Sequence, residues 1–275
     1  MPELPEVETT RRGIAGHVIG RRVGGVTLRR ADLRWPIPPE IGRELPGQRI
    51  DAVSRRGKYL LLETRAGSAL IHLGMSGMLR VLAPDVPVGR HDHFDIALAP
   101  LPGEATHILR FTDPRRFGSL LWQTPGSVHP LLAALGPEPL DAGFDGDVLW
   151  HAAHGHTAAV KTLLMDSHVV VGVGNIYANE ALFAAGIDPR RPAGRVSRVR
   201  YARLAIEVKR ILAHAIERGG TTLRDFLAPD GKPGYFFREL AVYDRAGEPC
   251  PHCGRPVRHA VIGQRSTYWC GHCQR

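Results

Sequence analysis

The chain has 275 residues, 43% of them hydrophobic, which is enough for one large core or two ordinary ones and excludes a wholly disordered protein. Its 36 Lys and Arg exceed its 27 Asp and Glu, and the net charge of +9 favours a polyanionic partner, either nucleic acid or an acidic membrane surface. The sequence contains no apolar run of about 18 residues, and its acidic start is the reverse of a signal peptide, so we expect a soluble cytoplasmic protein without a transmembrane helix.

A helix is predicted almost at the N-terminus. Leu4, Val7, Ile14 and Val18 recur at the spacing of one helical face. Pro5 suits the first turn of a helix, and the three glutamates among the first eight residues suit the positive end of the helix dipole.

Short apolar runs punctuated by Gly and Pro dominate the chain up to about residue 130. Closely spaced short strands of this kind are typical of an antiparallel sandwich or barrel. The predicted strands are Val23–Leu28, Tyr59–Glu63, Ala69–His72, Phe94–Leu98, His107–Phe111 and Ser119–Trp122.

The pattern changes after Gly136-Pro137-Glu138-Pro139, which we interpret as a domain boundary because Pro-rich polar stretches resist both helix and sheet. Ser197 can cap a helix that Gly219-Gly220 ends. Residues 188–224 contain ten Lys and Arg but three Asp and Glu. A solvated helix face would explain about half of this excess of positive charge. The apolar stripe of this helix is Leu204, Val208, Ile211, Leu212 and Ala215.

All four cysteines lie in the last 26 residues and form two C-x2-C knuckles. Two such knuckles joined by a short hairpin can complete a tetrahedral, closed Zn²⁺ site, which would be structural and not catalytic. Two disulfides are the alternative, but a cytoplasmic chain would keep these thiols reduced. The expected ligands are Cys250, Cys253, Cys270 and Cys273.

Pro2 is a candidate nucleophile. Removal of Met1 is expected before so small a residue, and it would leave Pro2 as a secondary amine able to form a Schiff base. An α-amino group has a pKa of about 8, and the helix dipole opposes its charge, so part of the population would be neutral at pH 7. Glu3 beside it could act as an acid or a base. An ordinary helix start is the alternative interpretation.

Two further patterns indicate contacts with nucleic acid. Gly172-Val173-Gly174-Asn175 lacks the third glycine of a dinucleotide fingerprint, but it predicts a turn that offers backbone N–H groups to a phosphate, or a purely structural turn. Met75 and Phe117 adjoin turns and could fill the gap left by a displaced base, or belong to the core. His91-Asp92-His93 lacks a third ligand cluster, so we do not interpret it as a metal site.

Seven motifs occur in one order along the chain and together resemble the bacterial formamidopyrimidine-DNA glycosylase family. The match runs from residue 2 to the last cysteine. The motifs are Pro2–Thr9, Lys58–Leu60, His72–Gly77, Asp113–Phe117, Val171–Ala178, Asp230–Phe236 and the zinc segment with Gly263-Gln264-Arg265.

The resemblance implies an α+β fold, with an N-terminal antiparallel β-sandwich flanked by helices over 1–135, a helical helix-two-turn-helix domain over 136–240 and a zinc finger over 241–275. It implies a monomeric glycosylase and abasic-site lyase that excises oxidised purines from duplex DNA and cleaves the strand by β,δ-elimination. One structural Zn²⁺ is the implied cofactor.

The resemblance also assigns roles to single residues. Pro2 would attack C1′, Glu3 would transfer protons, Lys58 would support β-elimination and Arg265 δ-elimination. The Asp230–Phe236 stretch would close over the lesion base. The implied wedge that fills the stack and faces the orphaned cytosine is Met75, Arg115 and Phe117, and the implied phosphate contacts are His91, Lys161, Asn175 and Arg265.

The chain departs from the family at His156 and Thr157, where relatives often carry further basic residues, so one phosphate contact would be weakened. It also departs at Trp269, where a smaller aromatic residue is usual. An endonuclease VIII-type glycosylase for oxidised pyrimidines is an alternative, against which Leu4 and the wedge residues stand. A zinc-ribbon protein that binds nucleic acid without catalysis is a third interpretation, but it leaves Pro2 and Lys58 unexplained.

Overall fold

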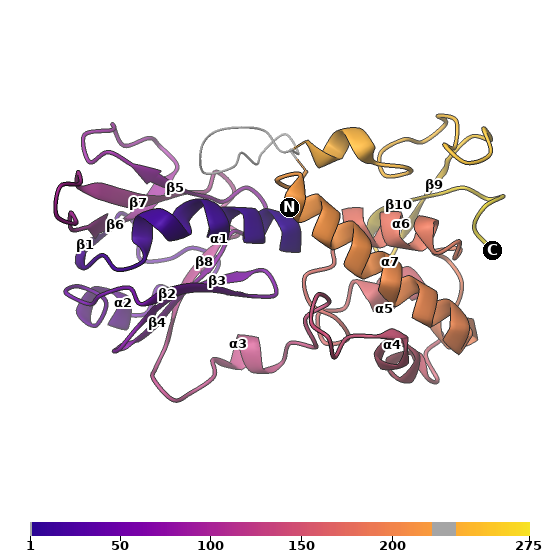
Figure 1. Cartoon of the computed structure of the whole chain (residues 1–275), viewed down its shortest axis with the longest axis horizontal. Helices are drawn as coiled ribbons and strands as arrows, with labels where there is room; N and C mark the ends of the chain where they lie inside the picture. Colours follow the sequence, from indigo (N-terminus) through magenta and orange to yellow (C-terminus); the bar gives the residue numbers. More distant parts are fainter. Residues whose placement is uncertain (1, 222–234) are drawn as a thin grey trace. The chain divides into compact units, whose positions relative to one another are not determined.

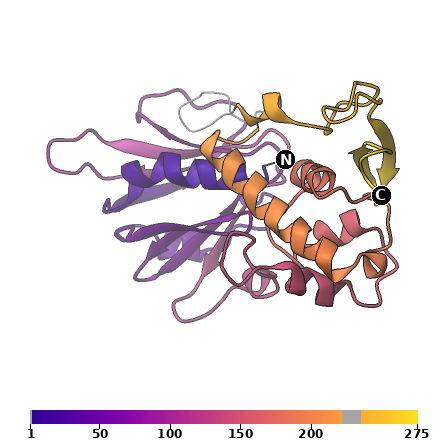
Figure 2. The same ribbon diagram turned by 45° about the vertical axis from the view of Figure 1, so that its right-hand side comes forward.

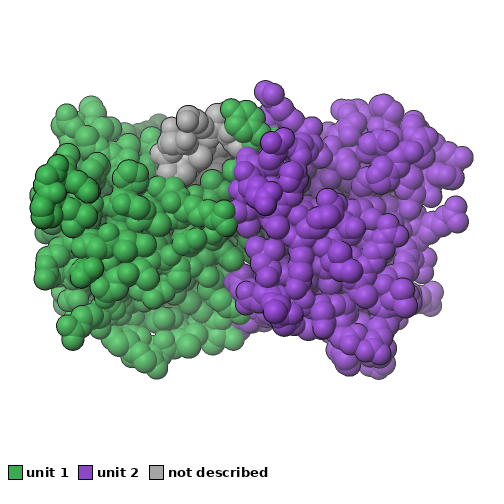
Figure 3. Space-filling view, viewed as in Figure 1, with its two compact units in different colours: residues 1–133, 219–235 green, residues 134–218, 236–275 purple. Residues whose placement is uncertain are grey.

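The computed structural model of the chain describes residues 2–221 and 235–275 (Figure 1). They fall into two compact units, coloured separately in Figure 3: unit 1 comprises residues 1–133 and 219–235, and unit 2 comprises residues 134–218 and 236–275. Across the described ranges, no helix is both long and apolar enough to cross a membrane.

Unit 1 is built on two four-stranded antiparallel sheets, as the predicted sandwich requires. One sheet has the order β1-β6-β7-β5 and the other β2-β3-β4-β8. The strands are β1 Val23–Leu28, β2 Ala52–Arg56, β3 Tyr59–Thr64, β4 Gly67–His72, β5 Met78–Leu82, β6 Asp92–Leu98, β7 His107–Thr112 and β8 Ser119–Gln123. The helices are α1 Leu4–Val18, α2 Glu40–Arg43 and α3 Pro130–Ala133.

The predicted helical face of α1 is confirmed. Val7, Ile14 and Val18 are fully buried in the core that the two sheets share, and α1 packs along β2, β3 and β5. Inside the sandwich, the rings of Phe94 and Phe111 stack with centroids 5.0 Å apart. Burial of large apolar side chains contributes about 1.5–3 kcal/mol each, so this core accounts for the position of α1.

The register of β4 and β8 places two turns side by side. His72 pairs with Ser119 at the end of this strand pair. The turn that follows β4 therefore lies beside the segment that precedes β8. These are the two stretches that carry the predicted wedge residues.

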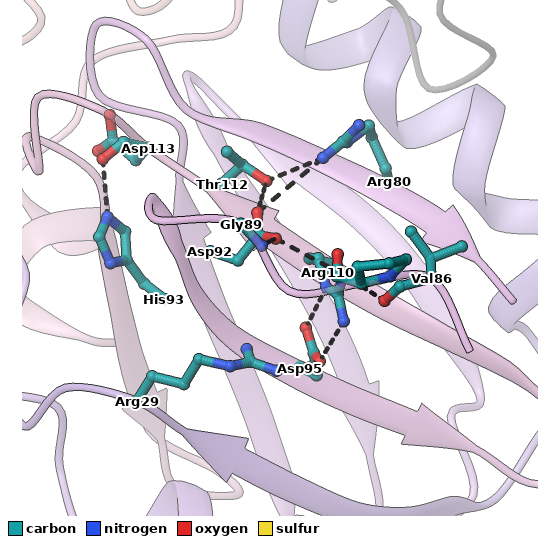
Figure 4. A network of polar contacts seen from close by, with 11 residues as sticks. Arg29, Arg80, Val86, Gly89, Asp92, His93, Asp95, Arg110, Thr112 and Asp113 are labelled. Atoms are coloured by element: carbon teal, nitrogen blue, oxygen red, sulfur yellow. Dashed lines mark hydrogen bonds and ion pairs between the residues drawn. The ribbon is translucent and has the colours of Figure 1, made fainter. Parts of the chain in front are cut away.

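An arginine is buried between the strands of the β1-β6-β7-β5 sheet (Figure 4). Arg110 is 2% exposed and binds both carboxylate oxygens of Asp95 at 2.9 Å. It also donates to the carbonyl oxygens of Val86 and Pro87 at 3.0 Å and lies 3.5 Å from Asp92. Arg110 therefore fixes the connection that leads from β5 to β6.

Unit 2 is helical and ends in a β-hairpin, as predicted. Its long helix α7 buries the predicted apolar stripe, and Ser197 occupies the N-cap position without a side-chain capping hydrogen bond. In Figure 2 the hairpin runs beside α6, against which β10 packs. The elements are α4 Gly146–Ala153, α5 Val160–Leu164, α6 Asn175–Ala184, η1 Ala193–Arg195, α7 Arg198–Glu217, η2 Phe236–Glu239, β9 Arg258–Ile262 and β10 Arg265–Trp269.

Removing the buried arginine is expected to destabilise unit 1 strongly. Arg110→Ala would leave the carboxylates of Asp92 and Asp95 short of their buried cation, a loss of about 3 kcal/mol in the free energy of unfolding. Arg80 is a matched control, because it reaches Asp92 from a partly exposed position and Arg80→Ala should cost less than about 1 kcal/mol. Denaturant unfolding measures both, and equal losses would contradict the assignment.

Candidate functional site

The first residues of the chain are buried and held in place. Pro2 is buried, and Glu3 is 2% exposed at the extended N-cap of α1. Glu3 and Glu6 form a capping box, in which the Glu6 carboxylate accepts the Glu3 backbone N–H at 2.8 Å. A chain end usually frays unless it is tied down, so the capping box orders the residues that flank the proposed amine.

Glu6 also ties this end to a segment far away in sequence. Its second oxygen accepts the backbone N–H and the hydroxyl of Thr221 at 2.8 and 2.9 Å. A Cβ at Gly220 would lie 2.9 Å from the same oxygen, so a side chain there would crowd the carboxylate. Sequence reasoning missed Glu6 as a site residue, although its spacing of three from the N-cap was a signal for the capping box.

Lys58 lies in the two-residue turn between β2 and β3. Gly57 holds a φ of +56° at the first turn position, as a type II′ hairpin requires. The turn is close enough to His72 for the Lys58 charge to act on it. Burial, together with the charges of Lys58 and Arg34, lowers the pKa of His72 to about 4.

The neutral His72 supports the turn before Met75. Its Nδ1 accepts the Gly74 N–H at 2.9 Å, and its ring lies 4.8 Å from the ring of Tyr59. Gly74 has a φ of +64°, and a Cβ there would lie 2.4 Å from the backbone of Phe117. The turns that carry Met75 and Phe117 therefore touch backbone to backbone.

The Asp113 carboxylate joins these two turns. It is fully buried and accepts the Ser76 hydroxyl at 2.6 Å, the Arg115 N–H at 3.3 Å and the Gly118 N–H at 2.8 Å. With the turn fixed, the side chains of Arg115 and Phe117 are exposed, Phe117 by 44%. Phe117 is therefore not a core residue, which leaves the wedge interpretation.

Arg115 and Phe117 also pair with each other, because the guanidinium lies 5.1 Å from the ring centroid. His91 lies next to this turn, since its carbonyl oxygen accepts the Asp113 N–H at 2.9 Å. His93, in the same run, donates its Nε2–H to the Asp113 carbonyl oxygen at 2.7 Å, as Figure 4 shows. His93 therefore has a structural hydrogen bond.

In unit 2, Lys161 and Asn175 hold the hairpin that carries Arg265. The Lys161 ammonium is buried and donates to the Ser266 carbonyl oxygen at 2.9 Å and to the Thr267 hydroxyl at 2.7 Å. The Asn175 amide donates to the same carbonyl at 3.0 Å. Within the described residues, the side-chain oxygen Oδ1 of Asn175 has no hydrogen-bond partner, whereas its backbone carbonyl oxygen accepts the Asn179 amide N–H at 2.6 Å.

Arg265 is the exposed first residue of β10. It follows a two-residue turn in which Gly263 and Gln264 have φ values of +54° and +61°. Both central residues of a type I′ turn need a positive φ. This turn and the bonds from Lys161 and Asn175 fix the start of β10, so the fold presents the guanidinium at the tip of the hairpin.

The four cysteine sulfurs lie within 4.8 Å of one another. Cys250 and Cys273 are 3.9 Å apart at Sγ, and Cys253 and Cys270 are 3.5 Å apart. Four thiolates at about 2.3 Å from one tetrahedral Zn²⁺ would be about 3.8 Å apart, whereas a disulfide needs about 2.0 Å. The cysteines therefore fit one structural Zn²⁺ and are not paired as disulfides.

The buried carboxylate of Glu180, which sequence reasoning missed, holds the segment that enters the zinc finger. Glu180 on α6 accepts the backbone N–H groups of Ala241, Val242 and Tyr243 at 2.8–3.0 Å. Burial raises the pKa of Glu180 despite these three bonds. No local sequence signal marks it, because its partners lie about 60 residues later.

The predicted site residues thus divide between the units. Unit 1 holds the N-terminal pair, Lys58, His91 and the wedge, and unit 2 holds Lys161, Asn175, Arg265 and the cysteines. Most of the stretch Asp230–Phe236 lies outside the described residues, which resume at Tyr235.

Lowering the pH from 6.5 to 4 is expected to destabilise unit 1 through His72. In this window the unfolded chain protonates His72 while the folded protein keeps it neutral, so the free energy of unfolding falls as the pH falls. Glutamine cannot titrate, so His72→Gln should show a shallower decline in melting temperature than the wild type. The exposed His154→Gln is the control, and a decline in His72→Gln as steep as in the wild type would count against this role.

Comparison with known families matches all three parts of the chain. Residues 1–120 match the formamidopyrimidine-DNA glycosylase N-terminal domain, residues 135–227 match the H2TH domain of the same enzyme, and residues 247–275 match a zinc finger found in FPG and IleRS. The last match supports the zinc assignment from the sulfur geometry.

Full-length relatives give the same result. The formamidopyrimidine-DNA glycosylase of Stenotrophomonas maltophilia (strain R551-3) is 67% identical over 275 residues, with 100% of both chains covered. The crystal structure of the MutM (Fpg) protein of Thermus thermophilus aligns with a TM-score of 0.88 at 40% identity, covering 99% of this chain and 98% of that one.

The Fpg of Lactococcus lactis has been solved in complex with DNA. Its complex with abasic-site DNA aligns with a TM-score of 0.90 at 31% identity over 99% of both chains. Its complex with Fapy-dG DNA aligns at 0.89 and 30% over 99% of this chain and 100% of that one. From the domain matches and the full-length identity, the chain belongs to the formamidopyrimidine-DNA glycosylase family.

Proposed function

We propose that this chain is a bifunctional DNA glycosylase and abasic-site lyase of base excision repair. Its substrates would be oxidised purines in duplex DNA, chiefly 8-oxoguanine opposite cytosine and ring-opened formamidopyrimidines. The observation that carries the proposal is the buried, capped Pro2–Glu3 start in a full-length member of this family. The Lactococcus lactis relative binds Fapy-dG and abasic-site DNA, which supports both halves of the activity.

The Pro2 nitrogen would attack C1′ of the damaged nucleotide once Met1 is removed. The bond from C1′ to the base breaks, and Glu3 transfers the protons that base departure and sugar opening require. A secondary amine gives a permanently charged iminium, which acidifies the C2′ proton. Loss of that proton expels the 3′ phosphate, with support from Lys58, and Arg265 assists the second elimination at the 5′ phosphate.

The wedge, in which Arg115 and Phe117 are exposed and Met75 is half-buried, would fill the space left by the displaced nucleotide. Met75, Arg115 and Phe117 lie on the two turns that Asp113 joins, so one carboxylate positions all three. Planar and apolar side chains of this kind replace the stacking that a flipped base gives up. Arg115 is the member able to form hydrogen bonds with the orphaned cytosine.

The DNA backbone would be held by His91 in unit 1 and by Asn175 and Arg265 in unit 2. The side-chain oxygen Oδ1 of Asn175 can only accept a hydrogen bond. Contact of Asn175 with a phosphate oxygen therefore requires the N–H groups of its side-chain amide. Lys161 would act partly through the hairpin, because its ammonium is directed at Ser266 and Thr267. Bound Zn²⁺ supplies structure and no chemistry.

We further propose functional domains at 1–135, 136–240 and 241–275 in a cytoplasmic monomer. The helical domain and the finger share one compact unit, and the family matches begin close to these boundaries. An endonuclease VIII-type specificity remains the second candidate function. The resemblance of Leu4 and of the wedge residues to the purine branch, with 67% identity to a formamidopyrimidine-DNA glycosylase, favours oxidised purines.

Blocking the N-terminus is expected to abolish both base release and strand cleavage. One added residue before Pro2 turns the secondary amine into an amide, which cannot form an imine. Borohydride trapping on abasic DNA, read by intact mass, should give a covalent complex with the wild type and none with the extended protein. The same residue added at the C-terminus is the control. Full lyase activity in the N-terminally extended protein would contradict the assignment of Pro2.

Loss of zinc is expected to unfold the finger and spare the rest of the chain. A hairpin this small gains its folding free energy from the metal, so Cys270→Ser should lose zinc and weaken DNA binding and cleavage severely. The melting transition of the β-sandwich should be retained. Normal cleavage by Cys270→Ser would show that the finger is dispensable.

The variant Arg265→Ala tests the role of the guanidinium separately from the role of the hairpin that carries it. This variant should keep its zinc and its fold but lose one phosphate contact, which lowers the slope of log K against log salt by about 0.9. Zinc content by atomic emission and salt titrations of binding measure both effects. An unchanged slope would remove Arg265 from the phosphate-binding set.

A further inference from the structure

Six arginines gather where the last zinc knuckle meets the connection between α6 and α7. They line two adjoining hollows of about 540 and 430 Å³, both of which include Arg275. We call this set the arginine surface: Arg190, Arg191, Arg195, Arg200, Arg203 and Arg275. None of the predicted catalytic or DNA-contacting residues belongs to it.

The fold builds this surface through the end of the finger. The Gln274 side chain donates to the Ile187 carbonyl oxygen at 2.8 Å and accepts the Cys270 N–H at 2.8 Å. The Arg275 N–H donates to the Gly186 carbonyl oxygen at 3.1 Å. The chain after the last knuckle is thereby docked on the turn after α6, and Arg275 is placed among the other arginines.

Arg200 reinforces this junction. Its guanidinium donates to the carbonyl oxygen of Gly186 at 2.7 Å and to an oxygen of the terminal carboxylate at Arg275 at 2.5 Å. Burial, and then the charges of Arg191 and Arg203, lower the pKa of Arg200. The arginines therefore repel one another in the folded chain, and an anion between them would relieve that repulsion.

The charge of the arginine surface is largely uncompensated. Among the described residues that line the hollows, Asp188 has the one side-chain carboxylate, and it is bound by Arg190, which also stacks 4.7 Å from the ring of Trp269. The terminal carboxylate at Arg275, which Arg200 contacts at 2.5 Å, is a second negative group. Among the described residues, no carboxylate pairs with Arg191, Arg195, Arg203 or the side chain of Arg275. Four guanidinium groups are thus available to a ligand.

We propose that the arginine surface is a second binding site for the phosphodiester groups of duplex DNA, separate from the lesion site. Guanidinium groups present donor pairs that match phosphate oxygens, and the surface contains arginine without lysine. An acidic peptide would also need apolar anchors, but the apolar side chains that line the hollows, apart from the zinc ligand Cys273, are the small Ala185, Pro192 and Val199. DNA as the polyanion rests on the proposed function.

The surface also adjoins the elements proposed to contact DNA in unit 2. The Val160 N–H donates to the Arg191 carbonyl oxygen at 2.8 Å, at the start of the helix that carries Lys161. Trp269, which Arg190 covers, ends the strand that Arg265 begins. A second DNA segment held here would keep the enzyme near DNA after it leaves a lesion.

The test fills the lesion site first and then asks whether DNA still binds. Wild-type protein is trapped covalently by borohydride on a short abasic duplex, and binding of a second, fluorescent, undamaged duplex is titrated at several salt concentrations. The trapped wild type should bind it with a Kd on the order of 10⁻⁶ to 10⁻⁴ M, the range of non-specific binding. Absence of second-duplex binding would overturn the proposal.

The variant Arg191→Gln/Arg195→Gln/Arg203→Gln removes three charges that no Asp or Glu of the described residues pairs with. It keeps Gln274 and Arg200, which dock the chain end, and loses one hydrogen bond, from Arg203 to the Ala184 carbonyl oxygen at 3.1 Å. It should weaken second-duplex binding at least tenfold and lower the salt slope by about 2 to 3. Excision from a short lesion duplex should stay within about twofold of the wild type. The matched control, Arg22→Gln/Arg43→Gln/Arg49→Gln, removes three exposed arginines of unit 1 and should leave second-duplex binding unchanged.

The remaining outcomes identify other ligands or separate the two proposals. Equal losses in both triple variants would mean a general charge effect and would overturn the site. Displacement of the second duplex by poly-glutamate at lower charge concentration than by unlabelled DNA would assign the surface to an acidic protein, and displacement by tripolyphosphate in the same way would assign it to free phosphates. If no trapped complex forms, the proposed function fails, and the two variants are then compared on undamaged duplex alone.

Discussion

The site in unit 1 depends on the hydrogen bonds that the Glu6 carboxylate accepts. Its two oxygens accept three hydrogen bonds, one from the Glu3 backbone and two from Thr221, and its side chain is 2% exposed. A terminal nitrogen can approach a substrate in a defined direction only if the residues after it are held in place. The end of a chain usually frays, because it has few neighbours to hold it. The buried carboxylate supplies that constraint on the residues that follow the proposed amine.

Buried carboxylates serve the same purpose elsewhere in the chain. Asp113 gathers the backbone of the two wedge turns, and Glu180 gathers three consecutive N–H groups at the entrance to the finger. Irregular backbone cannot satisfy its own N–H groups, and a carboxylate can accept several of them at once. Asp113 orders the turn that carries Phe117 in this way, so Phe117 is exposed on an ordered turn. The start of β10, with Arg265, is fixed instead by Lys161 and Asn175.

The sequence predicted the elements whose pattern is local. The face of α1, six of the strands and the cysteine cluster follow from spacing alone. β2 and β5 were missed because Arg55, Arg56 and Arg80 interrupt their apolar alternation. Each strand buries one residue in the sandwich, Val53 in β2 and Leu79 in β5. The contact of Glu6 with Thr221 could not be predicted, because the two residues are 215 positions apart and only the folded chain brings them together.

The finger has two ends, and each presents arginine for a different reason. At the hairpin tip, Lys161 and Asn175 fix the strand that begins with Arg265. At the other end, Gln274 docks the chain so that Arg275 joins the cations of the α6–α7 connection. One Zn²⁺ holds both ends, because Cys270 follows the hairpin strand and Cys273 precedes the docked residues. A structural metal without an open coordination position would therefore govern both of the proposed phosphate-binding surfaces at once, and part of the excess positive charge of the chain would depend on it for its placement.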